Sequence, residues 1–241
     1  MGKGAAAKTV ADEGAFDTWR LELGGIELAA DRSGTLYIQS ASALIVSDLH
    51  LEKGSSFARR RTLLPPYDTR STLRRLRLAI ERLRPKTVVA LGDSFHDAQG
   101  SERLCEEDRA SLVALQMGRD WVWIAGNHDP QLPAGLGGER AGDWRHGAVV
   151  FRHQPLAKPV DAEVAGHLHP CARVVRDGHQ QRRPCFAFGF GRLIMPAFGA
   201  YTGGLNVLDP AVAGLFADEP AIAVLGRSGV YPVAARQLRP D

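Results

Sequence analysis

The sequence predicts an α/β fold, and three observations lead to this prediction. Short apolar runs of strand length recur along the 241 residues, and segments with helical periodicity lie between several of them. Five of these runs are followed at once by Asp, Asn or His, the position where open α/β sheets place their sites, beyond the carboxyl ends of strands. The length also allows a sizeable core, and we expect one domain because α/β folds of this size often remain undivided.

The composition excludes several classes of protein. Hydrophobic residues make up 44% of the chain and charged residues 24%, as in water-soluble globular proteins. No apolar run approaches the ~18 residues of a membrane-spanning helix, and residues 1–16 lack the apolar core of a signal peptide. The three cysteines are widely spaced and form no CxxC pair, which fits the reducing cytoplasm. We expect a cytoplasmic protein without a membrane segment, in which residues 1–20 form a poorly ordered tail and residues 21–241 the domain.

The first expected elements are strands followed by a long helix. Residues 21–38 contain two strand-like runs on either side of a turn at Asp31–Gly34, and residues 43–48 form a short buried strand. Residues 68–85 read as an amphipathic helix with Asp68 as its N-cap and Pro85 at its end. The apolar stripe of this helix consists of Leu73, Leu76, Ile80 and Leu83.

The rest of the chain alternates between short buried strands and one further helix, expected within residues 101–117. The expected strands are residues 87–93, 121–127, 148–153, 163–167, 192–198, 221–226 and 229–234. The last two form a hairpin around Arg227–Ser228. Trp121 and Trp123 alternate with valine and isoleucine along their strand, which favours a place in the core over a base-stacking surface.

Histidines and carboxylates gather in the five positions that follow apolar runs. The runs continue as SDLH (47–50), LGDSFH (91–96), AGNHD (125–129), FRH (151–153) and GHLH (166–169). Imidazole and carboxylate together suit divalent ions such as Mn, Fe, Co or Zn, whereas Ca prefers oxygen ligands alone. Side chains at positions i and i+2 just beyond a strand can both point into the mouth of a sheet. The inventory is sufficient for two metal sites.

The order of these motifs resembles that of the calcineurin-like metallophosphoesterase superfamily. The pattern D-x-H, G-D-x-x, G-N-H-D, H, G-H-x-H spans residues 48–169. The chain is more narrowly similar to bacterial DNA ligase-associated metallophosphoesterases in DLHLEKGSSF (48–57), in PCFAFGFGRLIMPAFGAYTGG (184–204) and in the GHLHP form of the last motif. This resemblance covers nearly everything after about residue 20. It implies two stacked mixed β-sheets flanked by helices, with a dimetal site at the carboxyl ends of the strands.

The resemblance also implies a role for each matching residue. Asp48, His50 and His169 are expected to hold one metal, and Asn127, His153 and His167 the second. Asp93 is expected to bridge the two metals. Both would be divalent transition metals, with Mn expected and Fe, Co and Zn as alternatives.

Three further residues, His128, His96 and Lys53, are candidates for contacts with the substrate. His128 follows a ligand and is placed to contact the substrate phosphate, either stabilising charge or protonating the leaving oxygen. The second motif has the form G-D-x-x-H, which also occurs in DNA double-strand-break repair nucleases of the superfamily, and this makes His96 a second catalytic candidate. Asp97 either orients a histidine or caps the following turn. Lys53 is a candidate for substrate binding, with an ordinary exposed lysine as the alternative.

Charge is unevenly distributed along the chain, whose formal net charge is +3. From Glu52 to Lys86 eleven basic residues stand against three acidic ones, a local balance of +8. This segment either is a solvated helix face or faces a polyanion.

The function that we expect is that of a dimetal-dependent phosphodiesterase, a DNA nuclease in DNA repair. A hydroxide that bridges metals about 3.5–4 Å apart would attack the phosphodiester in line. The alternatives are a phosphomonoesterase or a nucleotide-diphosphate hydrolase of the same fold and, more remotely, a non-catalytic scaffold. Apart from the DNA substrate, the family resemblance implies a DNA ligase, a helicase and a nuclease as partners.

Overall fold

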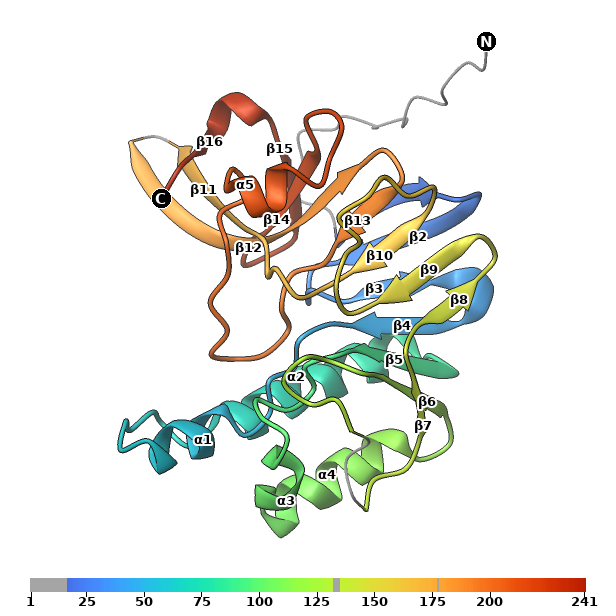
Figure 1. Cartoon of the computed structure of the whole chain (residues 1–241), viewed down its shortest axis with the longest axis vertical. Helices are drawn as coiled ribbons and strands as arrows, with labels where there is room; N and C mark the ends of the chain where they lie inside the picture. Colours follow the sequence, from blue (N-terminus) through green and yellow to red (C-terminus); the bar gives the residue numbers. More distant parts are fainter. Residues whose placement is uncertain (1–16, 132–134, 177) are drawn as a thin grey trace.

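Two mixed β-sheets lie face to face in the protein, with helices on their outer sides (Figure 1). The computed structural model describes residues 17–131, 135–176 and 178–241. The expected α/β sandwich is thereby confirmed. Residues 1–16 of the expected tail lie outside the described residues, but strand β1 already begins at Thr18 because the Trp19 side chain is buried between the sheets.

The first sheet has seven strands in the order β1-β2-β3-β4-β5-β6-β7. Strands β1 to β4 pair antiparallel, and β4 to β7 pair parallel. The parallel strands bring their carboxyl ends to one edge of the sheet. The bounds are β1 (Thr18–Leu23), β2 (Ile26–Asp31), β3 (Leu36–Ile38), β4 (Ala43–Val46), β5 (Thr87–Leu91), β6 (Asp120–Ile124) and β7 (Glu139–Ala141).

The second sheet has nine strands, of which seven follow the order β15-β14-β12-β13-β10-β9-β8. Strand β11 pairs with β12 and with β16 beside this path. Strands β9, β10 and β13 are parallel to one another. The bounds are β8 (Trp144–His146), β9 (Val149–Arg152), β10 (Glu163–Ala165), β11 (Cys171–Arg176), β12 (His179–Gly189), β13 (Arg192–Ile194), β14 (Ala221–Leu225), β15 (Val230–Val233) and β16 (Leu238–Arg239).

The longest helix confirms the predicted amphipathic segment. Helix α2 (Asp68–Leu83) buries Leu73, Leu76 and Ile80. Asp68 is not its N-cap, because Tyr67 holds that position and the Asp68 carboxylate instead accepts a hydrogen bond from the backbone N–H of Gly54 at 3.1 Å. The other helical elements are α1 (Lys53–Arg59), α3 (Gly100–Arg103), α4 (Glu106–Gln116), α5 (Pro210–Ala213) and the short 3-10 helices η1 (Gln39–Ala41) and η2 (Ala235–Gln237).

Three apolar layers hold these elements together. The largest lies between the two sheets and includes Leu36, Phe151 and Phe186. A second layer joins the first sheet to α2 and α4, and it contains Trp121 and Trp123 as predicted. A third covers the outer face of the second sheet. Within the described residues no helix is long and apolar enough to cross a membrane.

Some elements differ from the sequence-based expectation. Residues 21–38 hold parts of three strands, since the chain turns at Gly24 and Gly25, both at positive φ. The helix expected within 101–117 is divided into α3 and α4. Strands β11 and β12 were missed because they pair through a largely polar ribbon, and the first six residues of β12 are all exposed or half-buried.

Candidate metal centre

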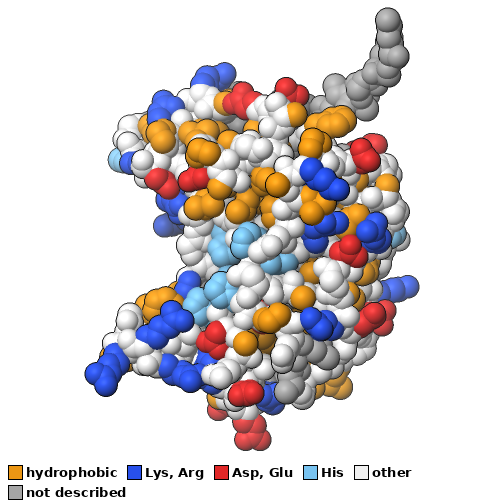
Figure 2. Space-filling view, in the orientation of Figure 1, with side chains coloured by type: hydrophobic (Ala, Val, Ile, Leu, Met, Phe, Trp, Pro, Cys, Tyr) orange, Lys and Arg blue, Asp and Glu red, His pale blue; other side chains and the backbone are white. Residues whose placement is uncertain are grey.

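The loops after five parallel strands bring the predicted ligands to one edge of the sandwich. Asp48 and His50 follow β4, Asp93 follows β5 and Asn127 follows β6, all in the first sheet. In the second sheet His153 follows β9, and His167 and His169 follow β10. Because both sheets end their parallel strands at this edge, the structure assembles all seven residues in one place. The space-filling view shows histidine side chains in a hollow of the surface there (Figure 2).

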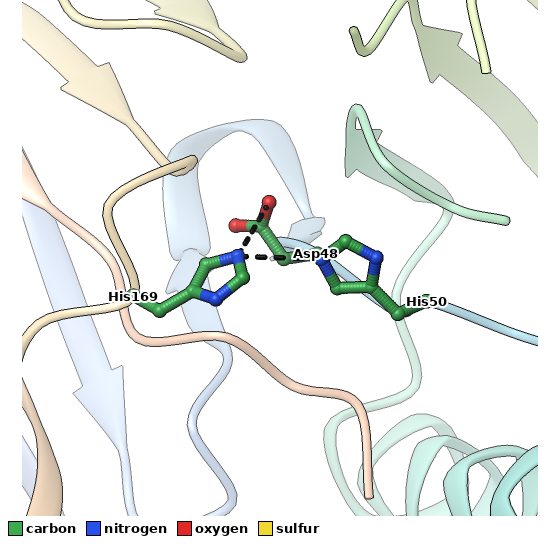
Figure 3. Close-up of side chains that lie close together, drawn as sticks. All are labelled: Asp48, His50 and His169. Atoms are coloured by element: carbon green, nitrogen blue, oxygen red, sulfur yellow. Dashed lines mark hydrogen bonds and ion pairs between the residues drawn. The ribbon is translucent and has the colours of Figure 1, made fainter. Parts of the chain in front are cut away.

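The first group consists of Asp48, His50 and His169, whose candidate ligand atoms all lie within 4.8 Å of one another. The Nε2 atoms of the two histidines are 3.4 Å apart, and His169 Nε2 is 3.2 Å from Asp48 Oδ1 (Figure 3). His169 Nδ1 donates to the carbonyl oxygen of Gly203 at 3.1 Å, which leaves Nε2 free to act as a ligand.

The second group consists of Asp93, His153 and His167 at the same spacing. His153 Nε2 is 3.4 Å from Asp93 Oδ2 and 3.2 Å from His167 Nδ1. Asn127 joins this group, with its Oδ1 atom 2.9 Å from His153 Nε2. His153 Nδ1 donates to the carbonyl oxygen of Leu91 at 2.9 Å, so its other nitrogen faces the group.

Asp93 lies between the two groups. Its Oδ2 atom is 3.4 Å from His153 Nε2 on one side and 3.9 Å from His50 Nε2 on the other. Its Oδ1 atom accepts the backbone N–H of His128 at 2.9 Å. Asp93 would therefore be available to both groups when they hold metals.

Metal binding needs ionised carboxylates and neutral imidazoles, and the pKa values of Asp93 and His50 meet this need. Burial alone would raise the pKa of Asp93, but the hydrogen bond and charge of His153 hold this pKa at about 2. Burial lowers the pKa of His50 to about 3. Both residues are therefore in the ligand form at neutral pH.

One buried oxygen atom indicates that the donor set fits a cation. Asp48 is fully buried, and its Oδ2 atom accepts hydrogen bonds from Ser47 Oγ and from the backbone N–H of His167. Its Oδ1 atom accepts no well-oriented hydrogen bond from a described residue, and the nitrogen beside it, His169 Nε2 at 3.2 Å, is itself a proposed ligand atom. A buried carboxylate oxygen without a donor is costly unless a positive charge faces it. The residues present therefore fit two divalent metals, with imidazole and oxygen ligands in each group.

Glycines allow the loops to approach one another closely at the centre. Gly92, Gly126 and Gly166 each precede a proposed ligand. A Cβ atom on Gly92 would lie 2.5 Å from the His153 ring, and one on Gly166 would lie 1.8 Å from Ser47 Oγ. Any larger residue at these positions would displace the ligand-bearing loops.

The two candidate catalytic histidines lie side by side next to the first group. The rings of His96 and His128 stack with centroids 5.4 Å apart, and the His128 side chain is 43% exposed. Both rings also lie within 5.5 Å of the His50 ring. Burial first, and then the charges of Lys53 and His128, lower the pKa of His96 to about 4. His96 is therefore a neutral imidazole at neutral pH.

Lys53 and Asp97 lie near these histidines but have different surroundings. Lys53 begins α1 and donates from Nζ to the carbonyl oxygen of Tyr201 at 2.8 Å. Asp97 accepts the backbone N–H of Gln99 at 3.0 Å and forms a double hydrogen bond with Arg103. Of the two roles considered for Asp97, these contacts favour the capping of the turn.

Sequence reasoning did not assign a role to Asp129, the last residue of the AGNHD motif. Its side chain is buried, and Oδ2 accepts the backbone N–H of Phe95 at 2.9 Å, which fixes the loop that carries His96. Burial raises the pKa of Asp129 to about 7. The sequence offered one signal for a role of Asp129, its place two residues after the proposed ligand Asn127. Its hydrogen-bond partner Phe95 lies 34 residues away in the chain, so the sequence did not indicate this contact.

The two stacked sheets thus carry two adjacent candidate metal-binding groups at one edge. The sequence profile of calcineurin-like phosphoesterases matches residues 41–184. The chain belongs to the calcineurin-like phosphoesterase family, whose members use a dimetal site.

Comparison with solved structures gives a similar result. The chain is similar to the nuclease MPE of Pseudomonas putida, with 25% sequence identity and a TM-score of 0.70. The match covers 90% of this chain and 100% of the nuclease. A comparison with curated proteins found no match to this chain.

Proposed function

We propose that the protein is a metal-dependent phosphodiesterase that cuts DNA in a repair process in the cytoplasm. The observation that carries this proposal is the similarity to a nuclease, which is matched over the nuclease's whole length. In addition, every expected ligand position of the site has the expected side chain. A non-catalytic scaffold has no need of seven such residues at one edge. The identity of the metals is part of the proposal, and we expect manganese.

Different residues of the chain are assigned different roles at the phosphate. When bound, the metals would supply Lewis acidity toward the phosphate oxygens and lower the pKa of a water molecule. Asp93 and the two flanking groups fix where the phosphate lies. His128, the more exposed of the paired histidines, is positioned to protonate the leaving oxygen. His96 is neutral, so we assign it a hydrogen bond from its ring N–H to a phosphate oxygen.

The basic segment after the first motif supports a polyanionic substrate. Figure 2 shows Lys and Arg side chains on the projecting α1 region, beside the hollow that contains the histidines. The side chains of Arg60 and Arg61 are exposed and form no hydrogen bond or ion pair with a described residue. By contrast, Arg75 and Arg82 on α2 bind other parts of the protein. The α1 region, rather than the whole segment from Glu52 to Lys86, is therefore our candidate for contacts with the DNA backbone.

The test compares bis(p-nitrophenyl) phosphate with p-nitrophenyl phosphate in manganese, followed by single-stranded and duplex DNA. We expect hydrolysis of the diester and cleavage of DNA, both abolished by Asp93→Ala and strongly reduced by His128→Ala. His179→Ala, on the exposed end of β12, serves as the control. Rapid monoester turnover with intact DNA would favour the small-phosphate alternative. A lack of hydrolysis with Mn, Fe, Co and Zn would favour the scaffold.

The partners suggested by the family resemblance remain part of the proposal. A DNA ligase, a helicase and a nuclease acting in the same repair process are the proteins to test for co-purification with this chain.

A further inference from the structure

A cavity opens beside the second ligand group, at the place where the chain passes from one sheet to the other. Its volume is about 310 Å³. One part of the lining follows β6, from Ala125 to Asn127, and another runs from the last residue of β9, Arg152, to Gln154. Gly142 and Asp143, which connect β7 to β8, complete the lining. Since Asn127 and His153 belong to the second group, anything bound in the cavity lies next to the reacting phosphate.

The Arg152 side chain lies at the wall of this cavity between two carboxylates, and its buried Nε atom makes no hydrogen bond with a described residue. Its Nε atom is 3.4 Å from Glu163 Oε1, and its guanidinium is 3.9 Å from Asp143 Oδ2. Glu163 is buried and is itself fixed by Arg192, which donates from Nε to Glu163 Oε2 at 2.7 Å. Arg192 also donates to the carbonyl oxygens of Leu156, Lys158 and Leu215. The Glu163 carboxylate that faces Arg152 is therefore held in place from its other side.

The charges of the cavity favour a neutral polar ligand over a second phosphate. The acidic and basic residues that line the cavity are Asp143 and Arg152, one charge of each sign, so the lining carries no excess positive charge. Asp143 offers acceptors, whereas Arg152 and Gln154 offer donors. The edge of a nucleobase carries both donors and acceptors, and a phosphate carries acceptors only.

We propose that this cavity binds the nucleoside on the side of the scissile phosphate that is not expelled. His128 is assigned to the leaving oxygen and lies by the His50 ring in the first group, whereas the cavity opens by Asn127 and His153 in the second. The proposal rests on the phosphodiesterase function proposed above. It makes Arg152, Asp143 and Gln154 the residues that distinguish a nucleotide ester from a simple diester.

The experiment measures kcat/KM in manganese for methyl p-nitrophenyl phosphate and for thymidine p-nitrophenyl phosphates linked through the 5′ or the 3′ oxygen. We expect the wild-type protein to prefer one thymidine ester over the methyl ester. Arg152→Ala should reduce this preference about tenfold through KM, the effect of about one hydrogen bond to a charged group. Arg152→Lys should restore part of it. Arg145→Ala is the matched control, because Arg145 also pairs with Asp143 but lies outside the cavity.

A second variant covers the case in which Arg152→Ala fails to fold. Gly142 is an exposed residue of the lining and a Cβ atom there meets no described atom within 4 Å, so Gly142→Leu adds bulk to the lining without a clash and should reduce the preference. The cavity proposal would be overturned if both variants lost kcat/KM equally for the methyl and the thymidine esters. It would also be overturned if the wild-type protein showed no preference for a thymidine ester. If the wild-type protein hydrolyses neither kind of diester, the phosphodiesterase function itself fails.

Discussion

Five of the proposed ligands lie in a backbone conformation that L-amino acids rarely adopt. Asp48, His50, Asp93, His167 and His169 have φ values between 44° and 69°. Such residues cost about 1–3 kcal/mol each and persist only where the surrounding structure imposes them. The left-handed turns let side chains two residues apart face the same centre. This explains how the D-x-H and H-x-H motifs each supply two ligands.

Gly92 provides a test, at the scale of one residue, of how closely the loops pack around the ligands. Gly92→Ala should displace His153, because Gly92 has a φ of 72° and its added Cβ would lie 2.5 Å from that ring. We expect metal content to fall from two toward one per chain, as measured by elemental analysis of purified protein. Gly118→Ala is the control, since Gly118 has a φ of 73° but open space around its Cβ position. Equal metal loss in both variants would mean that backbone strain, not the clash, governs the site.

His96 is the second test at this scale. His96→Ala should leave both metals in place, because its ring belongs to neither ligand group, while the loss of its hydrogen bond to a phosphate oxygen lowers turnover roughly 10²-fold. Metal content and steady-state rates on the same preparation provide the measurement. His146→Ala, on β8 and away from the centre, is the control. If the His96 variant lost its metals along with its activity, the residue would be structural.

The residues of the site were largely predictable because motif order is a local property of the sequence. All seven proposed ligands follow apolar runs, and the structure places them together. What the sequence did not indicate depends on distant contacts. Lys53 reaches the carbonyl of Tyr201, 148 residues away, and Asp129 acts through the backbone of Phe95.

At the scale of elements, helix α2 is tied to the β2–β3 turn by an ion pair. Arg82 donates to both carboxylate oxygens of the fully buried Asp31, at 2.8 and 2.7 Å. Burial by itself would raise the pKa of Asp31, but the hydrogen bonds from Arg82 and Ser33 lower it below its model-compound value of 3.8. The contact joins segments 51 residues apart, and neither segment by itself predicted it.

Arg82→Ala should therefore destabilise the protein in a pH-dependent way. Removing one partner leaves a buried carboxylate uncompensated, at a cost of about 3 kcal/mol at pH 7. Asp31 has a depressed pKa in the folded state, so its contribution is present above pH 3.8 and is lost as the pH falls through the lower folded value. Urea unfolding of both proteins at pH 7 and near pH 3 should show this difference shrinking on acidification. A constant difference would assign the effect to lost packing by Arg82.

Element prediction succeeded where the apolar pattern was strong. Strands β4, β5 and β6 are continuous buried runs, and α2 has a clear apolar stripe. Strands β7 and β8 are three residues each and mostly polar, so they depend on pairing with β6 and β9. Short edge strands of this kind carry little signal of their own.

At the scale of the whole molecule, each metal group draws ligands from both sheets. His169 completes the first group with Asp48 and His50, and His153 and His167 complete the second with Asp93 and Asn127. Metal binding therefore joins the two halves of the sandwich as well as serving the reaction. Any ion that binds the folded state alone raises the free energy of unfolding.

Chelation should consequently lower the stability of the entire protein. At a free manganese concentration 100 times the dissociation constant, each site contributes about 2.7 kcal/mol. Thermal unfolding followed with and without chelator should show one cooperative transition that moves to lower temperature without metal. His169→Ala should show a smaller shift, because one group is incomplete. A transition that chelator does not move would contradict the coupling of the sheets through the metals.

The division of ligands between the two sheets also fixes an order of events during synthesis. Asp48, His50, Asp93 and Asn127 leave the ribosome first, but each group is finished only when His167 and His169 have emerged. A nascent chain that ends before His167 contains some of the carboxylate and imidazole ligands but neither complete ligand group. A chain truncated before residue 167 therefore lacks His167 and His169, and both ligand groups remain incomplete.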